Sequence, residues 1–351
     1  MPHDHQPAPS SIATSAAANP IVVEVTRGSM VESRHRAAVA IVDNDGKVVQ
    51  AWGDVDRPVY GRSAIKPLQA LPLIETGAAD RYAVSVAETA LACASHSGEP
   101  RHVQLVSAWL ARIGCSMADL ECGSHLPHHE PSVEALMRAG RQPDATYNNC
   151  SGKHTGFLTT ARHLGEPTKG YIRYEHPVQQ RILGTLEQMT GLRLGDAPRG
   201  IDGCGIPVIG IPLGNMAMAM ARLADPADLP PARAAAAARI LAAMAAEPFL
   251  VAGTGRFCTK VMDVVGKKVA MKTGAEGVYA AALPTLGLGV AIKVDDGTGR
   301  AAEVVMGRVL QHLKLLTADE ARVLADTLTP PVRNRVGLET GRVTIAADSP
   351  F

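Results

Sequence analysis

A serine and a lysine three residues apart, Ser63 and Lys66, form the only SxxK pattern in this chain. On a helix, residues at positions i and i+3 share a face, so the lysine amine can lie beside the serine hydroxyl. A serine needs a neighbouring base to attack a carbonyl, and a desolvated lysine can be neutral enough to be that base. The pattern indicates a serine nucleophile, although a serine near a helix start followed by an exposed lysine is the commoner meaning of one isolated match.

Two later segments add another hydroxyl and another amine. Ser95 lies in Cys-Ala-Ser-His-Ser at the end of a helical pattern, and Lys272 begins a Lys-Thr-Gly that precedes a strand pattern over 277–283. The order SxxK, serine-centred loop and Lys-Thr-Gly is typical of serine β-lactamases and penicillin-binding proteins. If Ser63–Lys66 and Ser95–Lys272 share one cleft, burial and the repulsion between two ammonium groups lower a lysine pKa. We therefore expect acyl transfer on an amide without a histidine base, with the charged lysine stabilising the tetrahedral intermediate.

Glycine-flanked cysteines form a third group of reactive residues. Cys150, Lys153 and His154 lie in NNCSGKHTG, and Asp202 and Cys204 lie in IDGCGIP about fifty residues later. Two thiolates are soft zinc ligands that a neighbouring Asp or His can orient, whereas a lysine binds a metal only when it is neutral. The spacing does not match CxxC, so buried structural thiols are the alternative interpretation.

The elements that must position these residues fall into two groups. Strand patterns occupy 21–28 and 36–54, the second interrupted by an Asn44-Asp45-Gly46 turn, and they return at 278–297, before a helical pattern over 300–316. Between them the patterns are helical, for example over 63–76, 102–113, 177–189 and 231–246. We expect an α+β fold in which an antiparallel sheet is formed from both chain ends with a helical insertion. A cleft is expected where the sheet meets the helices.

The expected organisation is a disordered N-terminal tail, 1–20, followed by a single catalytic unit, 21–351. Within that unit we expect a sheet lobe, 21–62 plus 265–351, and a helical lobe, 63–264. The tail lacks the basic start and apolar run of a secretory signal, and no apolar stretch reaches the ~20 residues that span a bilayer. Six cysteines in a long chain of this kind favour reduced thiols, so we expect a cytoplasmic protein.

Charge and motif content narrow the possible functions. The 351 residues include 35 basic and 34 acidic side chains, so the formal net charge is +1 and favours neither nucleic acid nor an anionic membrane. GxxxxGK[ST], complete GxGxxG, HExxH and GxSxG patterns are absent from the sequence. Kinase, dinucleotide-binding, zincin and α/β-hydrolase functions therefore have no support in the sequence.

Six ordered segments resemble a known family. They are GRSAIKP (61–67), CASHSGEPRH (93–102), NNCSGKHTG (148–156), IDGCGIP (201–207), AGTGRFCT (252–259) and the lysine of MKTGAEG (271–277). With them the chain, from about residue 28 to 299, resembles the rhizobial-type (class 3) L-asparaginases. The resemblance implies hydrolysis of L-asparagine to L-aspartate and ammonia, in a fold similar to serine β-lactamases and glutaminases.

Family roles carry over to the matching positions of this chain. The resemblance implies two catalytic pairs, Ser63–Lys66 and Ser95–Lys272, with Ser63 as the nucleophile that forms an acyl-enzyme. It implies a zinc cofactor held by Cys150, Lys153 and Cys204, with water at the fourth position. The residues around the pocket, in substrate-binding or supporting roles, are Arg62, His154, Asp202 and Cys258. A homodimer is also implied.

Other functions remain open at this stage. A glutaminase or β-lactam-type amide hydrolase would use the same Ser–Lys pairs. A non-catalytic amino-acid-binding protein, or a structural zinc protein, would keep the fold without using the serines. The residues also leave open which serine attacks and which lysine is neutral.

Overall fold

The computed structural model describes residues 18–351. Most of the tail expected at 1–20 therefore lies outside the described residues. Its last part is placed: Asn19 is buried, donates to Asp295 Oδ1 (2.8 Å) and accepts a hydrogen bond from the Asp54 backbone N–H (2.7 Å). These two bonds fix the chain immediately before the first strand.

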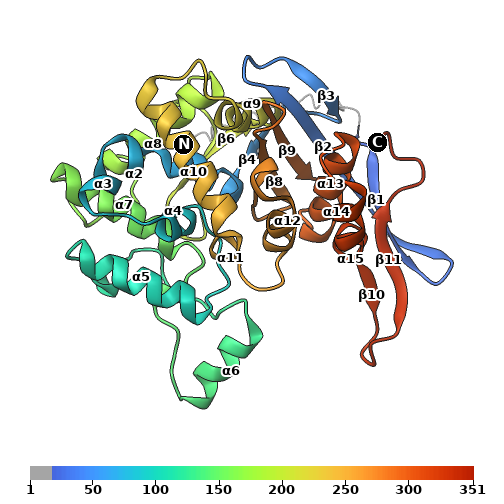
Figure 1. Ribbon diagram of the computed structural model, residues 1–351, viewed down its shortest axis with the longest axis horizontal. Coiled ribbons are helices and arrows are strands. Elements are labelled where there is room, and N and C mark those ends of the chain that lie inside the picture. Colours follow the sequence, from blue (N-terminus) through green and yellow to red (C-terminus); the bar gives the residue numbers. More distant parts are fainter. Residues whose placement is uncertain (1–17) are drawn as a thin grey trace, which may run out of the picture.

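The main sheet has eight antiparallel strands. They are β1 (Ile21–Arg27), β2 (Met30–Asp43), β3 (Val48–Trp52), β7 (Ala270–Thr273), β8 (Val278–Leu283), β9 (Leu288–Val294), β10 (Pro331–Arg333) and β11 (Glu339–Ile345). The order is β10-β11-β1-β2-β9-β8-β7, and β3 pairs with β2. At the centre, Ala40 of β2 pairs with Ala291 of β9. The sheet thus joins the two ends of the chain, which confirms the expected fold class (Figure 1).

Strand β2 is long enough, at 14 residues, to organise three neighbours. Its first half pairs with β1, and its second half pairs with β9 along one edge and with β3 along the other. The turn between β2 and β3 lies at Asn44-Asp45, as the sequence predicts. Strand β7, which carries Lys272, is the last strand at one end of this order.

The two faces of the sheet are covered by different helices. A Cβ on Gly289 would lie 1.9 Å from the Ala217 carbonyl oxygen, so α9 (Leu213–Ala224) packs on that face through backbone contact that only glycine permits. Side chains alternate between faces along a strand, so Tyr279, paired with Ile292, points to the opposite face. There it contacts α12 (Phe257–Val265), and α13 (Gly299–His312) packs beside it.

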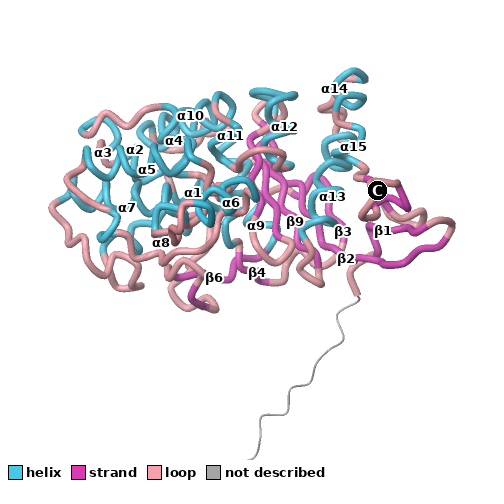
Figure 2. The backbone as a smooth tube through the Cα atoms, turned by 90° about the horizontal axis from the view of Figure 1, so that it is seen from below, coloured by secondary structure: helices cyan, strands magenta, loops and turns pink. Residues whose placement is uncertain are grey.

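The helical region lies beside the sheet and occupies the other half of the molecule (Figures 1 and 2). Its helices are α1 (Lys66–Gln69), α2 (Leu71–Glu75), α3 (Ala78–Arg81), α4 (Val86–Ala92), α5 (Pro100–Arg112), α6 (Glu130–Arg138), α7 (Ser151–Leu164), α8 (Pro177–Thr190), α10 (Pro231–Ala246) and α11 (Pro248–Val251). A small sheet, in the order β4-β6-β5, contains β4 (Pro58–Tyr60), β5 (Arg199–Ile201) and β6 (Pro207–Pro212). Short α14 (Ala318–Val323) and α15 (Ala325–Leu328) precede β10.

Two expected helices differ from their predicted bounds. The pattern over 63–76 folds as the 3-10 turn η1 (Arg62–Ile65) followed by α1 and α2. Pro67 and Pro72 cause this break, because a proline lacks the N–H of a helical bond and clashes with the preceding turn. The helix expected over 300–316 ends at His312, and Lys314 then adopts a left-handed φ of +56° that cannot continue it.

Helix α7 is the buried centre of the helical region. Its first eleven residues are all buried among α2, α3, α4, α5 and α8. A Cβ on Gly152 would lie 2.4 Å from the Leu91 carbonyl oxygen, so this glycine lets the start of α7 contact the end of α4. The loop after α4 contains Ser95, and the start of α7 follows Cys150, so this close packing brings two predicted site segments together.

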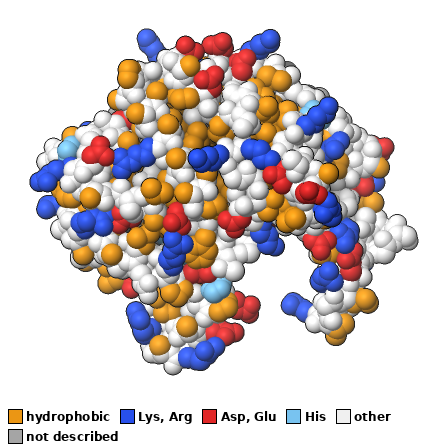
Figure 3. Space-filling view, viewed as in Figure 1, with side chains coloured by type: hydrophobic (Ala, Val, Ile, Leu, Met, Phe, Trp, Pro, Cys, Tyr) orange, Lys and Arg blue, Asp and Glu red, His pale blue; other side chains and the backbone are white. Residues whose placement is uncertain are grey.

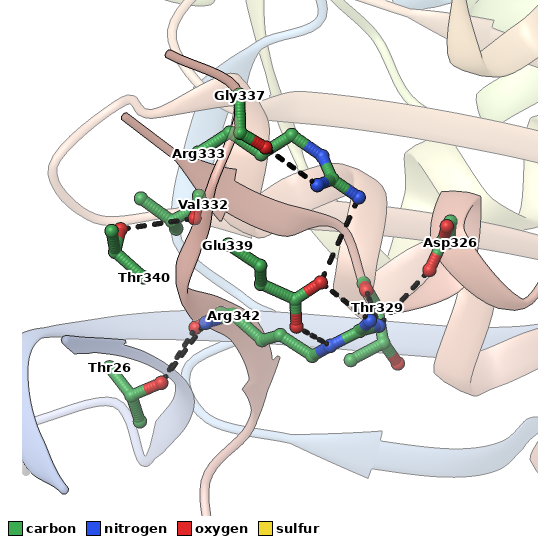
Figure 4. Close-up of polar contacts among 9 residues, drawn as sticks. All are labelled: Thr26, Asp326, Thr329, Val332, Arg333, Gly337, Glu339, Thr340 and Arg342. Atoms are coloured by element: carbon green, nitrogen blue, oxygen red, sulfur yellow. Dashed lines mark hydrogen bonds and ion pairs between the residues drawn. The ribbon is translucent and has the colours of Figure 1, made fainter. Parts of the chain in front are cut away.

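The surface carries mixed charge, and an ion pair links the outer strand β11 to α15. Figure 3 shows acidic and basic side chains interspersed on one face, with a hollow beside the β10–β11 ribbon. Arg342 of β11 pairs with Glu339 Oε1 of the same strand (2.7 Å) and with Asp326 Oδ1 of α15 (3.1 Å) (Figure 4). Within residues 18–351 no helix is long and apolar enough to cross a membrane.

Candidate active site

Two buried lysines from distant segments meet at one serine hydroxyl. Lys66 begins α1, and Lys272 lies in β7. The amine of Lys272 lies within hydrogen-bond distance of Ser95 Oγ (2.8 Å) and donates to the Thr273 carbonyl oxygen (2.5 Å). The amine of Lys66 donates to Ser95 Oγ (3.1 Å), to the Ala94 carbonyl oxygen (2.5 Å) and to Cys150 Sγ (3.1 Å). Ser95 therefore links both lysines.

The environment changes the protonation of Lys272. Its side chain is fully buried, and burial is the largest cause of a pKa that lies well below the ordinary lysine value. The charges of Lys66 and Arg256 lower the pKa further, while Cys258 and Cys150 raise it. A neutral amine is a base, so this lysine can accept a proton from a hydroxyl.

The loop that carries Ser95 is fixed by its neighbours. The Ser95 backbone N–H donates to the Val251 carbonyl oxygen (3.0 Å), and the His96 N–H donates to the Asn149 carbonyl oxygen (3.2 Å). Ser97 Oγ donates to the Ala252 carbonyl oxygen (2.9 Å). Cys93, at the end of α4, is an inert thiol, because burial raises its pKa to about 12.

Ser63 lies in η1, immediately beside the end of strand β7. A Cβ on Gly274 would be 3.0 Å from the Gly61 carbonyl oxygen and 3.1 Å from the Ala64 N, so glycine permits the two segments to touch. Ser63 is half-buried, and among the described residues its hydroxyl has no hydrogen-bond partner. The Lys66 backbone N–H bonds to the Ser63 carbonyl oxygen, but the Lys66 amine points to Ser95 and Cys150. The structure thus leaves the Ser63 hydroxyl available.

Arg62 and Asp202 hold the turn that carries Ser63. Arg62 adopts a left-handed φ of +47°, a backbone conformation that is unfavourable for any residue other than glycine. Its Nε donates to Asp202 Oδ1 (2.6 Å), and this oxygen also accepts from the Gly203 N–H (2.9 Å). Burial raises the pKa of Asp202, but the charges of Lys153 and Arg62 outweigh burial and hold that pKa below its usual value. An ionised carboxylate therefore fixes the guanidinium.

The two predicted zinc-ligand segments come together around Lys153. Cys150 is the N-cap of α7, Lys153 lies in its first turn, and Cys204 lies in the turn between β5 and β6. The Lys153 amine donates to Cys204 Sγ (3.1 Å). Hydrogen bonding from Cys204 is the main cause that lowers the pKa of Cys150 well below its usual range, and Lys66 and Lys153 lower it further. The same hydrogen bond, with burial, raises the pKa of Cys204.

These residues fit zinc by donor type. Two sulfurs and one amine, close together and buried, form a set that zinc accepts once the amine is neutral. Burial lowers the pKa of Lys153, yet the neighbouring Cys204, Cys150 and Asp202 together raise it overall, so ligation must displace that proton. Among residues 18–351 no group of three or more His, Cys, Asp or Glu side chains is placed to hold a metal ion. A metal here would therefore need Lys153 as its third protein ligand.

His154 and Cys258 are buried residues that each contact a tyrosine hydroxyl. His154 is fully buried, and its Nδ1 contacts the Tyr171 hydroxyl (2.8 Å). Cys258 Sγ, in α12, contacts the Tyr279 hydroxyl (2.8 Å), and Tyr279 pairs across the sheet with Thr273, next to Lys272. Among the hydrogen bonds of the described residues, neither side chain contacts the Ser63 or Ser95 hydroxyl.

Sequence reasoning missed several residues that shape this site. Tyr171 lies behind the predicted metal-ligand segments, and no pattern in the sequence distinguishes it from an ordinary loop residue. Ser151 lies inside the segment NNCSGKHTG, but nothing in that segment indicates that its hydroxyl contacts the His96 ring. The Ala94 carbonyl oxygen, a main-chain acceptor for Lys66, has no sequence signal at all. His96 lies inside a motif that sequence analysis singled out, and only its burial separates a supporting role from a catalytic one.

The site combines a serine on a strained turn with a lysine–serine–lysine cluster at the edge of a sheet, which is an arrangement suited to amide hydrolysis. The L-asparaginase II family model matches residues 23–345. The chain belongs to that family, as the resemblance predicts, and it is therefore an asparaginase-type amidohydrolase.

Comparisons with individual proteins give weaker likenesses. No curated protein matches significantly. A β-lactamase from Mycobacterium bovis (Mb2281c) has 15% identity and a TM-score of 0.37, covering 83% of this chain and 95% of that one. A protein named Mglu has 15% identity and a TM-score of 0.42, with 86% and 73% covered. Unliganded simvastatin synthase (LovD) from Aspergillus terreus has 13% identity and a TM-score of 0.37, with 82% and 93% covered.

Proposed function

We propose that the protein hydrolyses L-asparagine to L-aspartate and ammonia through an acyl-enzyme. One observation carries the mechanism: the buried amines of Lys66 and Lys272 both reach Ser95 Oγ, at 3.1 and 2.8 Å. This cluster offers a base and a cation together at the end of β7, against which the turn of the half-buried Ser63 packs. The family supports asparagine as the substrate.

In the proposed reaction, Ser63 Oγ attacks the side-chain carboxamide carbon, and its proton passes through the Ser95 hydroxyl to the Lys272 amine. The charge of Lys66 stabilises the oxyanion of the tetrahedral intermediate. The carbon–nitrogen bond then breaks, and the proton on Lys272 moves to the leaving nitrogen, which departs as ammonia. Water attacks the resulting ester and gives up a proton by the same route, and aspartate leaves as Ser63 regains its proton.

The surrounding residues have supporting roles in this proposal. Arg62 and Asp202 hold the turn of Ser63 through their 2.6 Å contact. Cys258 supports the strand of Lys272 through Tyr279, and His154 supports the first turn of α7. A variant of any of these residues should change kcat while the Ser–Lys cluster itself is retained.

The sharpest test measures ammonia release from asparagine by wild type, Ser63→Ala and Ser95→Ala. The matched control is Ser107→Ala, on the exposed face of α5. We expect Ser63→Ala to lose at least ~10³-fold in kcat with its thermal midpoint unchanged, because covalent attack is impossible without that oxygen. Full activity of Ser63→Ala would reject the nucleophile. Glutamine and nitrocefin are assayed in parallel. If asparagine is the poorest of the three substrates, the proposal that asparagine is the substrate is rejected.

We also propose a zinc ion held by Cys150, Lys153 and Cys204, supported by the convergence of two thiols and one amine. When bound, zinc supplies a fixed positive charge that orders the pocket and attracts the polar groups at the α-carbon of the substrate. Metal content is measured on purified wild type, Cys150→Ala and the control Cys115→Ala. Equal content in all three proteins would reject the site.

The assembly and location are proposals of the same kind. We propose a cytoplasmic homodimer, in line with the family resemblance and with six cysteines that are all free. Sedimentation at several protein concentrations tests the dimer, and cell fractionation tests the location.

A further inference from the structure

The hydrogen bonds around His96 define the protonation of its ring. The imidazole is fully buried, and its Nδ1 accepts from the Gly98 backbone N–H (3.2 Å). Its Nε2 contacts Ser151 Oγ (2.9 Å), and that hydroxyl donates its own proton to the Thr146 carbonyl oxygen (2.9 Å). The serine oxygen is therefore an acceptor for the ring. The only arrangement that satisfies all three contacts is a neutral imidazole with its proton on Nε2.

His96 joins two segments of the site, its own loop after α4 and the start of α7. His96 follows Ser95 directly, and its backbone N–H donates to the Asn149 carbonyl oxygen (3.2 Å). Ser151, which accepts from the ring, follows Cys150 directly and begins α7. The ring and backbone of one residue thus join the loop of Ser95 to the turn of Cys150. The amine of Lys66 lies between these same two residues and contacts both side chains.

The back of the ring is also covered. His96 stacks on His102 with ring centroids 4.9 Å apart, and His102 stacks on Phe249 at 4.6 Å. His102 Nδ1 accepts from the Glu99 N–H (3.2 Å), and its Nε2 contacts the Phe249 carbonyl oxygen (3.1 Å), so this ring is fixed as well. The imidazole of His96 cannot rotate without disturbing this stack, and none of the contacts of its ring is to Ser63, Lys66 or Lys272.

We propose that His96 is a positioning residue: its Nε2–H bond to Ser151 sets the separation of the Ser95 loop from the start of α7, and thereby the place of Ser95 Oγ between the two lysines. The proposal rests on the hydrolytic function proposed above. Proton transfer requires hydrogen-bond distances among the participating groups, and a displacement of about 1 Å can cost 10²-fold in rate. A shift of the Ser95 loop would change kcat far more than substrate binding, because Ser95 acts on the transferred proton.

Substitution of His96 by glutamine or by asparagine tests its two ring hydrogen bonds separately. Glutamine places an N–H near the position of Nε2 and can keep the bond to Ser151, whereas asparagine places an acceptor near Nδ1 and keeps only the bond from Gly98. We expect His96→Asn to lower kcat by about 10- to 100-fold with KM within threefold, and His96→Gln to stay within fivefold of wild type. His163→Asn, at the end of α7, is the control and should leave both constants unchanged.

A double-mutant cycle tests the bond itself. Ser151→Ala should lower kcat about as much as His96→Asn, and the double variant should lose no more than either single variant, because both remove one shared contact. Equal loss in the glutamine and asparagine variants, or losses that multiply in the double variant, would overturn the proposal. So would a loss that falls on KM with kcat unchanged.

Nitrogen NMR of the histidine rings tests the geometry without any turnover. The His96 signals, assigned by their absence in His96→Gln, should show a neutral ring protonated at Nε2 from about pH 5.5 to 8. A proton on Nδ1, or an imidazolium in this range, would overturn the proposal. If wild type releases no ammonia from asparagine, the proposed function fails, while the NMR result still decides whether His96 has the arrangement inferred here.

Discussion

Replacing Lys272 by methionine separates what this amine does for the reaction from what it does to stability. Methionine is similar in length, fills the same buried space and leaves Ser95 Oγ with Lys66 alone, at 3.1 Å. A positioned acid or base typically contributes about 10²- to 10⁴-fold to a rate, so we expect kcat to fall by about 10³, or about 4 kcal/mol of barrier. The assay is initial-rate ammonia release at saturating asparagine.

The same substitution should change how stability depends on pH. Burial, followed by the charge of Lys66, holds the pKa of Lys272 well below its ordinary value of 10.5. Between the lowered pKa and 10.5, the unfolded chain binds a proton at this lysine that the folded protein does not bind. Stability rises with pH wherever the unfolded state binds more protons, at up to about 1.4 kcal/mol per pH unit for one group. Wild type should gain this increment with rising pH, and Lys272→Met should not.

Urea unfolding, followed by tryptophan fluorescence at about pH 7 and about pH 9, measures this difference. We expect the unfolding free energy of wild type minus that of Lys272→Met to become more positive at the higher pH. At the lower pH the variant should be at least as stable as wild type, because it removes an amine whose burial is costly. Lys47→Met, in the exposed turn after β2, is the control. Parallel pH profiles for wild type and Lys272→Met, together with a kcat within threefold of wild type, would refute the reasoning.

Three further predictions concern the turn of Ser63 and the outer strands. Arg62 has a φ of +47°, which glycine adopts more readily than alanine, so the free energy of unfolding of Arg62→Gly should exceed that of Arg62→Ala by about 1 kcal/mol. Both variants lose the contact with Asp202, so this comparison isolates the backbone effect. A calorimetric measurement in which Arg62→Ala is equally or more stable would contradict this prediction. Gly274→Ala should lower kcat at least tenfold because the new Cβ pushes against η1, whereas Gly184→Ala, with open space in α8, should be neutral or stabilising; equal kinetics would contradict the packing argument. Arg342→Met should cost about 1 kcal/mol in urea unfolding and leave kcat unchanged, since its ion pairs are partly exposed and remote from the serines; a loss of activity would show a coupling that the structure does not contain.

The sequence predicts the sheet and the membership of the site better than the orientation of its side chains. Apolar runs rich in β-branched residues at both chain ends are enough to predict that β2 and β9 lie in one sheet, because a strand that is covered on both faces is apolar at successive positions. The motif order places Ser95 and Lys272 in one expected cleft, and the structure has their side chains 2.8 Å apart. The order of the motifs therefore predicts that these two distant segments lie together, and the packing of the described residues places them together.

The direction of Lys66 could not be predicted in the same way. Helical spacing puts its amine beside the Ser63 hydroxyl only if one continuous helix contains both residues. Pro67 and Pro72 break that helix, and η1 ends where Lys66 begins α1. The buried amine of Lys66 instead donates to acceptors on Ala94, Ser95 and Cys150. These residues lie on distant segments, and the spacing of Ser63 and Lys66 does not predict where those segments lie.

The number of hydrogen bonds supports the proton route that we propose through Ser95 to Lys272. Lys66 has three acceptors, which is the number that the three N–H groups of an ammonium require. The amine of Lys272 has two hydrogen-bond partners, the Thr273 carbonyl oxygen and Ser95 Oγ, and burial lowers its pKa. If both lysines were charged, each would donate to Ser95, and the hydroxyl proton of Ser95 would have no acceptor among the described residues. A neutral Lys272 removes this conflict, because its lone pair accepts that proton.

This assignment also separates the roles that we propose for the two serines. The Ser95 hydroxyl is engaged on both sides by amines, so it is suited to pass a proton and poorly suited to leave its partners and attack carbon. The Ser63 hydroxyl has no such partner among the described residues and lies on a turn held by Arg62. A covalent adduct on Ser63 with asparagine, trapped at low pH and located by mass spectrometry of the peptides, would agree with these roles. An adduct on Ser95 would reverse them and would require Lys272 to act directly on the attacking oxygen.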